Sequence, residues 1–128
     1  MIKRIYIMAP ASTWDGDRYE QFIHLLYHEY PTATIIEQKD TPECPKGIST
    51  VIFIRGEDRC IDINMWTQLN LAHAGSRIIK LARMDRDGLL VFVPWRQLEF
   101  DVKDDGHVQV GYAKPAASKQ EKVEVVSS

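Results

Sequence analysis

Two strand–helix–strand patterns follow one another in the first 81 residues, and this order constrains the fold more than any other feature of the sequence. Residues 4–8 form a short apolar run, residues 17–30 carry apolar side chains at helical spacing, and a second apolar run covers 33–37. The pattern then repeats, with apolar runs at 50–55 and 77–81 on either side of a second helical pattern. Strands that alternate with helices build a parallel sheet with right-handed crossovers. The sequence therefore predicts an α/β fold of flavodoxin-like or Rossmann-like type, a mostly parallel sheet with flanking helices.

Capping residues set the expected limits of the two helices. Asp17 precedes the first helical pattern with Glu20 three positions later, which predicts an acidic version of the capping box. Asp62 is placed to cap the second helix, and Gly75 is placed to end it in a left-handed conformation. The apolar side chains of residues 51–54 are continuous, as expected for a central strand that is covered on both faces.

The pattern changes after the second strand–helix–strand repeat. Residues 85–88 are typical of a turn, and residues 89–93 form an apolar strand. Apolar side chains then alternate on both sides of a polar turn at 103–106, which predicts a C-terminal antiparallel β-hairpin at the edge of the sheet. Residues 1–113 are expected to form a single α/β domain, and residues 114–128, which lack apolar periodicity, are expected to form a polar, flexible tail.

Charge and cysteine content exclude several functional classes. The 16 Lys and Arg residues against 18 Asp and Glu residues give a formal charge of -2 at pH 7 and a pI of about 6.1. Nucleic-acid binding needs a surplus of basic residues on one face, so nucleic acid is not expected as the main partner. Cys44 and Cys60 are too few for a disulfide framework, and the apolar runs are far shorter than the roughly 20 residues of a membrane helix. We therefore expect a cytoplasmic protein without a membrane segment.

Polar side chains gather in the loops that follow the first and third expected strands. In open α/β sheets, ligands bind beyond the carboxyl ends of the strands, where the strand order reverses. The two loops carry five carboxylates and one tryptophan toward that point, a combination that suits ribose hydroxyls, a cation or acid–base chemistry on a sugar. The expected binding residues are Ala9, Pro10, Ser12, Thr13, Trp14, Asp15, Gly56 and Glu57. The alternative is that Asp17 and Asp62 are only helix caps and that the other carboxylates are solvated loop charges.

Three short segments carry a resemblance to a known enzyme family. Residues 3–10, with the sequence KRIYIMAP, residues 51–58 and residues 72–79 resemble segments of the nucleoside 2-deoxyribosyltransferases and their uncharacterised bacterial and phage relatives. In that family these segments are the opening strand, the third strand with its acidic loop, and a helix end with the fourth strand. The likeness spans residues 3–80 and implies the same α/β fold.

The resemblance also implies roles for individual residues. In that family a Tyr on the first strand orients the nucleophile, an acidic residue after the third strand binds or protonates the base, and a Glu on the next helix attacks the sugar. Tyr6 matches the first role and Asp58 matches the second. The Glu should fall at Thr67, and the second helical pattern contains no acidic residue. Only Asp62 or Glu57 could then supply the carboxylate that covalent glycosyl transfer requires.

The loop residues and the resemblance leave three possible functions. The first is a binding domain for a nucleoside or nucleotide with weak or no catalysis, which the missing Glu favours. The second is an enzyme that cleaves or transfers an N-glycosidic bond with Tyr6, Asp58 and Asp62 as catalytic residues. The third is a phage or mobile-element accessory protein that acts through protein–protein contacts. We expect no cofactor and no metal, and we expect a homodimer because the resembled family completes its sites across subunits.

Histidine and tryptophan residues outside these loops offer further candidates. His24 and His28 are four positions apart on the first helical pattern, a spacing that can chelate a metal, but they lie opposite the apolar stripe and are expected to be solvated. Trp66 is expected in the core. Trp95 is expected in an edge segment that meets a second subunit or covers the crevice.

Overall fold

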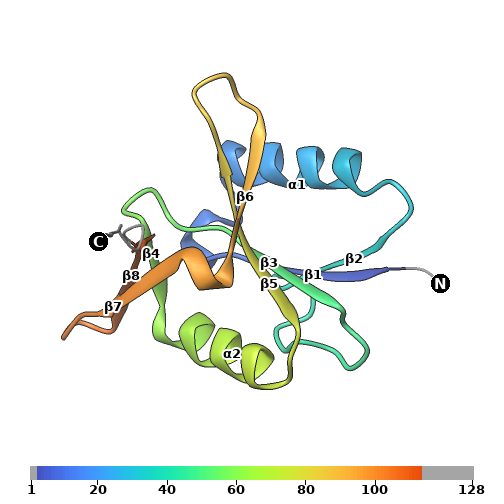
Figure 1. The fold of residues 1–128 in the computed structure, drawn as a ribbon. Helices are drawn as coiled ribbons and strands as arrows, with labels where there is room; N and C mark the ends of the chain where they lie inside the picture. Colours follow the sequence, from blue (N-terminus) through green and yellow to red (C-terminus); the bar gives the residue numbers. More distant parts are fainter. Residues whose placement is uncertain (1–2, 114–128) are drawn as a thin grey trace, which may run out of the picture.

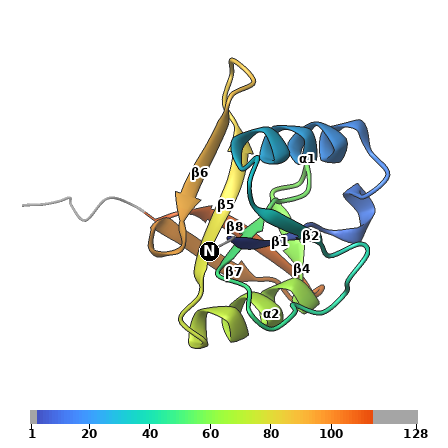
Figure 2. The same cartoon turned by 90° about the vertical axis from the view of Figure 1, so that its right-hand side faces the viewer.

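A five-stranded sheet forms the centre of the structure, a computed structural model that describes residues 3–113 of the 128-residue chain (Figure 1). The strand order is β2-β1-β3-β5-β6, and all neighbouring pairs are parallel except β5 with β6. The strands are β1 (Arg4–Met8), β2 (Thr34–Glu37), β3 (Thr50–Phe53), β5 (Ile78–Met84) and β6 (Leu90–Pro94). Helix α1 (Asp17–Glu29) lies on one face of the sheet and α2 (Ile63–Ala74) lies on the other (Figure 2). The predicted α/β class with a mostly parallel sheet is confirmed.

A smaller antiparallel sheet lies on the same face as α2. Its order is β4-β8-β7, with β4 (Cys60–Asp62), β7 (Leu98–Val102) and β8 (His107–Tyr112), and a short 3-10 helix, η2 (Trp95–Gln97), leads into it.

The predicted C-terminal hairpin forms as β7 and β8, but its expected place at the edge of the parallel sheet is wrong. Strand β6 occupies that edge, and β8 pairs with β4 instead. The physical reason is burial, because Val108 and Val110 of β8 join the cluster that contains Phe53 of the central strand. The face of the parallel sheet offers them more apolar contact than its edge would.

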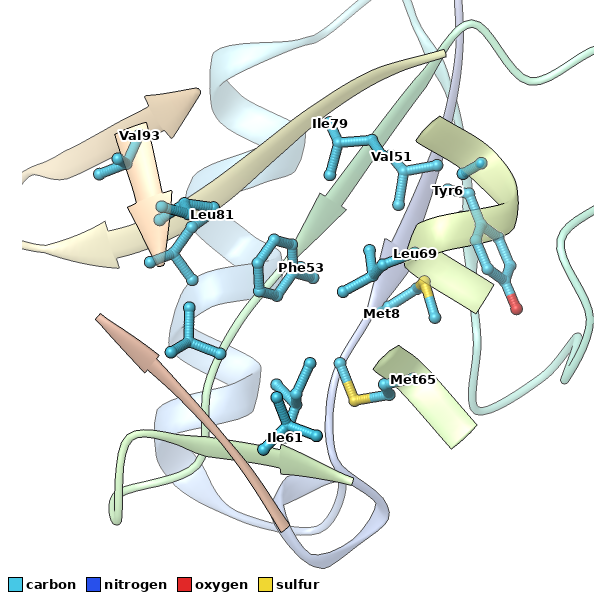
Figure 3. Close-up of a cluster of buried hydrophobic side chains, with 14 of the residues drawn as sticks. Tyr6, Met8, Val51, Phe53, Ile61, Met65, Leu69, Ile79, Leu81 and Val93 are labelled. Carbon is cyan, nitrogen blue, oxygen red and sulfur yellow. The ribbon is translucent and has the colours of Figure 1, made fainter. Parts of the chain in front are cut away.

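Strands β1 and β3 are buried on both faces because their side chains alternate between two separate cores. Tyr6, Met8 and Phe53 join α2 and the smaller sheet, and Figure 3 shows Phe53 between Leu81 and Leu69 in that cluster. The alternate side chains, among them Ile5, Ile7, Ile52 and Ile54, join α1. Every residue of β3 is buried, which confirms the prediction of a central strand.

The first helix begins without the predicted capping box. Gly16, in an extended conformation, is the N-cap residue, and Asp17 is already helical. No side chain in the described part of the chain accepts a hydrogen bond from the first turn. The 3-10 helix η1 (Ala11–Thr13) sets this register, because the Gly16 amide bonds to the Thr13 carbonyl and the helix starts at the next residue. Asp17 therefore lies inside the first turn, where its negative charge interacts favourably with the helix dipole.

The second helix confirms one capping prediction and contradicts the other. The Oδ1 atom of Asp62 accepts a hydrogen bond from the Met65 amide at 2.8 Å, so Asp62 is the N-cap. Gly75 has a φ of -83° and is not left-handed. Its amide still bonds to the Leu71 carbonyl in the helical pattern, so the left-handed turn moves to Ser76, with a φ of 61°.

Within residues 3–113, no helix has both the length and the apolar character needed to span a bilayer. The predicted polar tail, residues 114–128, lies outside the residues that the structure describes.

We expect Asp62→Ala to lower the free energy of unfolding by about 1 kcal/mol, because the Met65 amide loses its acceptor. Asp17→Ala is the matched control, since Asp17 caps nothing and loses only a helix-dipole interaction of about 0.3 kcal/mol. Urea unfolding of both variants, followed by circular dichroism, measures the difference. Equal losses in the two variants would contradict the assignment of Asp62 as the stabilising cap.

Candidate functional site

A crevice of about 600 Å³ lies between the loop after β1 and the loop after β3. The two strands are adjacent and parallel, so their following loops meet at one edge of the sheet, where the strand order reverses. A hydrogen bond of 2.9 Å from Arg18 Nη1 to the Arg55 carbonyl joins the two sides. The residues that line the crevice are Ser12, Thr13, Gly16, Asp17, Arg18, Gly56, Glu57 and Asp58.

A second hollow of about 210 Å³ shares Ser12, Gly56 and Asp58 with this crevice and extends it toward β4. It brings in two more of the predicted residues, Pro10 and Asp62. The structure thus gathers seven of the eleven predicted site residues in two adjoining hollows, and they are Pro10, Ser12, Thr13, Gly56, Glu57, Asp58 and Asp62.

Asp58 and Gly56 belong to a closed turn. The Gly56 amide bonds to the Cys60 carbonyl at 3.0 Å, Arg59 has a φ of 64°, and Asp58 Oδ1 accepts from the Cys60 amide at 3.0 Å. A Cβ atom on Gly56 would come within 2.9 Å of Asp58 Oδ1, so a larger residue there would displace the Asp58 carboxylate. One oxygen of Asp58 is therefore held by its own loop.

Tyr6 does not line either hollow. Its side chain belongs to the core on the α2 side, and its hydroxyl donates a hydrogen bond to the Thr41 carbonyl (Figure 3). Burial raises the pKa of Tyr6 well above its usual value of 10.0, with smaller contributions from Cys44 and Glu43. The alternation along β1 causes this placement, because Tyr6 and Ile7 must point to opposite faces of the sheet.

Three other predicted residues lie outside the hollows. Trp14 packs against the α1 core and donates from Nε1 to the Ala9 carbonyl at 3.0 Å, so its ring is part of the fold. The Ala9 amide donates at 3.2 Å to Oε1 of Gln38, a buried side chain that the sequence analysis did not single out. Ala9 and Trp14 therefore position the loop after β1. Asp15 is exposed and lines neither hollow.

The charge inside the crevice is mainly negative. Asp17, Glu57 and Asp58 contribute carboxylates, and Arg18 contributes a guanidinium group that also lies 5.1 Å from the centroid of the Phe22 ring. Arg18 was not predicted as a site residue, although its position next to Asp17 in the first turn of the helix could have indicated it. Carboxylates beside hydroxyl side chains suit a ligand that donates hydrogen bonds, such as a polyol.

Trp95 lines neither hollow and packs against the core on the α2 side of the sheet. It follows β6, whose last residue, Pro94, pairs with Lys80 of β5. The prediction that Trp95 covers the crevice is therefore wrong, because its ring is used in packing on α2. Trp95 instead stacks with Trp66, 6.3 Å between ring centroids, and with His73 at 5.1 Å.

Trp66 is half-buried at the margin of the α2-side core, so its predicted place in the core holds only in part. His24 and His28 are exposed on α1, as expected. No three His, Cys, Asp or Glu side chains in residues 3–113 come together as a candidate metal site.

Comparison of the chain with protein-family models, with curated proteins and with solved structures finds no match. The resemblance to nucleoside 2-deoxyribosyltransferases therefore stays a prediction.

We expect Tyr6→Phe to lower the free energy of unfolding by about 1 kcal/mol, because the Thr41 carbonyl loses its donor. Tyr27→Phe is the control, since Tyr27 is 47% exposed and the change should stay within about 0.5 kcal/mol. Urea unfolding measures both. A Tyr6→Phe variant with unchanged stability but lost ligand binding would contradict a structural role and support the role that the resemblance implies.

Stability should fall as the pH rises above about 10. Burial raises the pKa of both Tyr6 and Tyr19 above the usual 10.0, and for Tyr19 its 2.7 Å hydrogen bond to the Glu37 carboxylate adds to the effect. The unfolded chain loses these protons first, so the stabilisation is complete below pH 10 and is lost above it, by up to about 1.4 kcal/mol per pH unit for each tyrosine. Urea unfolding between pH 8 and 11 measures the slope, which should be shallower in Tyr6→Phe.

Proposed function

We propose that the protein binds a nucleoside or nucleotide in the crevice between the β1 and β3 loops, without transferring or hydrolysing the glycosidic bond. The observation that carries this proposal is the lining of the crevice, where three carboxylates lie with two hydroxyl side chains at the point of strand-order reversal. Carboxylates accept hydrogen bonds from the hydroxyl groups of a ribose, as an acidic residue does in dinucleotide-binding sheets. The order β2-β1-β3-β5 supports a flavodoxin-like arrangement with its ligand at this edge.

The size of the crevice supports a ligand of this class. Its volume of about 600 Å³ lies within the range of roughly 300–1,000 Å³ that small-molecule sites occupy. The Thr13 hydroxyl donates to the Pro10 carbonyl at 2.7 Å, so its oxygen can accept a hydrogen bond from a bound ligand.

The phosphate of a nucleotide would find donors at one end of the crevice. Helix α1 begins there at Gly16 and Asp17, and no side chain caps its first turn. Free amides at a helix start, together with the Arg18 guanidinium, favour a negatively charged group. These donors support a nucleotide as well as a nucleoside.

The positions of the proposed catalytic residues favour binding over catalysis. The Tyr6 side chain lies in the α2-side core and its hydroxyl donates to the Thr41 carbonyl, and one oxygen of Asp62 accepts from the Met65 amide. Helix α2 carries no acidic residue. Glycosyl transfer through a covalent intermediate needs a carboxylate positioned beneath the sugar, and the Asp62 carboxylate is already used as a helix cap.

Titration with a panel of ribonucleosides, 2′-deoxynucleosides and their monophosphates tests this proposal by calorimetry. We expect at least one ligand to bind and Glu57→Gln to weaken its binding by about tenfold, because a carboxylate acceptor is lost without a change in shape. The matched control is Glu99→Gln on β7, an exposed residue outside the crevice, which should leave binding unchanged.

Three results would overturn this proposal. Equal binding by the wild type and Glu57→Gln would place the ligand outside the crevice. Release of free base, detected by chromatography and abolished by Asp62→Ala, would support the glycosidase or transferase instead. Failure of every ligand to bind would favour the accessory protein that acts through protein contacts. The expected homodimer stays a prediction, and light scattering of the full chain measures it.

A further inference from the structure

Two arginine side chains meet at a single tyrosine ring, on the side of β3 that faces the smaller sheet. Arg55 follows β3, Arg83 lies on β5, and Tyr112 is the last residue of β8. The Cζ atoms of the two arginines lie 5.3 and 5.8 Å from the centroid of the Tyr112 ring. Both guanidinium groups therefore form cation–π contacts with the same ring.

Neither guanidinium is paired with a carboxylate in the part of the chain that the structure describes. The ion pairs within residues 3–113 involve Lys39, Lys103 and His107. Among residues 3–113, Arg55 donates only to uncharged oxygens, the Val110 carbonyl at 2.7 Å and the Tyr112 hydroxyl at 3.1 Å. Two positive charges thus share one ring without a compensating negative charge among the described residues.

Arg83 has an unpaired hydrogen-bond donor. Its Nε atom is buried and has no hydrogen-bond partner among the described residues. Nearly all buried donors in folded proteins are paired, and a buried donor without an acceptor is destabilising. The described residues therefore leave the Nε–H group of Arg83 without an acceptor.

An oxyanion beside the two arginines would supply the missing negative charge. Its charge would offset the two guanidinium charges, and its oxygens would accept from the outer N–H groups of the arginines, since the Nε atom of Arg83 is buried. The planar fork of arginine matches the tetrahedral edge of a phosphate as two parallel hydrogen bonds. Phosphate, with up to two negative charges near neutral pH, is a better match for two arginines than a single carboxylate.

We propose that Arg83, with Arg55 beside it, forms a binding site for a phosphate group where β5 meets the end of β8. Neither arginine lines the crevice, so this phosphate site is distinct from the site proposed there for a nucleoside. The phosphate belongs either to free inorganic phosphate or to a phosphate monoester, and both present the same oxygens to the two guanidinium groups.

Inorganic phosphate binding to the full chain tests the proposal, with thermal unfolding and the NMR signals of the arginine Nε–H groups as readouts. At constant ionic strength, phosphate in place of chloride should raise the unfolding temperature and shift the Arg83 Nε–H signal. Arg83→Met should weaken phosphate binding by at least about tenfold, because it removes a charged donor while keeping the apolar stem. Arg96→Met, on η2 after β6, is the control and should bind phosphate as the wild type does.

A second variant keeps the test valid if Arg83→Met does not fold. Arg83→Lys retains the positive charge but not the planar fork, and it should also bind phosphate more weakly than the wild type. Glycerol phosphate is titrated beside inorganic phosphate, and tighter binding of the ester identifies a monoester as the source. The proposal is overturned if phosphate stabilises the chain no more than chloride does, if acetate matches phosphate, or if Arg83→Met and the wild type bind phosphate equally.

Discussion

The burial of β1 and β3 on both faces is the constraint on which the rest of the structure depends. Their parallel register places Ile5 beside Thr50 and Met8 beside Phe53, so both strands end at the same level. A slip of one residue would turn every side chain of a strand to the opposite core. Because the register is fixed in this way, the loops after the two strands meet at one edge of the sheet and enclose the crevice.

The sequence predicted those helices and strands whose burial produces a regular spacing of apolar residues along the chain. The spacing of Tyr19, Phe22 and Leu26 in α1 and the continuous apolar run of β3 both record contact with a core. The three residues of β4 leave no such pattern, because the strand exists only through pairing with β8, more than forty residues later. The same pairing decided where the C-terminal hairpin packs, and it cannot be inferred from the alternation of the hairpin itself.

The same difference between local and long-range contacts explains which residues of the candidate site could be predicted from the sequence. The order of strands and helices predicted which two loops flank the crevice, but not which of their side chains turn away from it. Tyr6 points to the opposite core because of its place in the alternation of β1, and Trp14 is held by the Ala9 carbonyl. Asp17 and Asp62 fit the same capping rule equally well in sequence. The register of the 3-10 turn before α1 makes Gly16 the cap and leaves Asp17 to line the crevice, whereas Asp62 caps α2.

The end of β3 also explains how a chain with a net charge of -2 presents two surfaces of opposite character. The alternation of the strand continues past its last paired residue, so Ile54 joins the α1 core while Arg55 extends toward β8. The next residues, Gly56 to Asp58, turn back toward α1 and carry their carboxylates into the crevice. A single strand end thus separates an acidic hollow from a pair of guanidinium groups. A hydroxyl-rich ligand in the crevice and a phosphate group at the two arginines would therefore bind on opposite sides of β3.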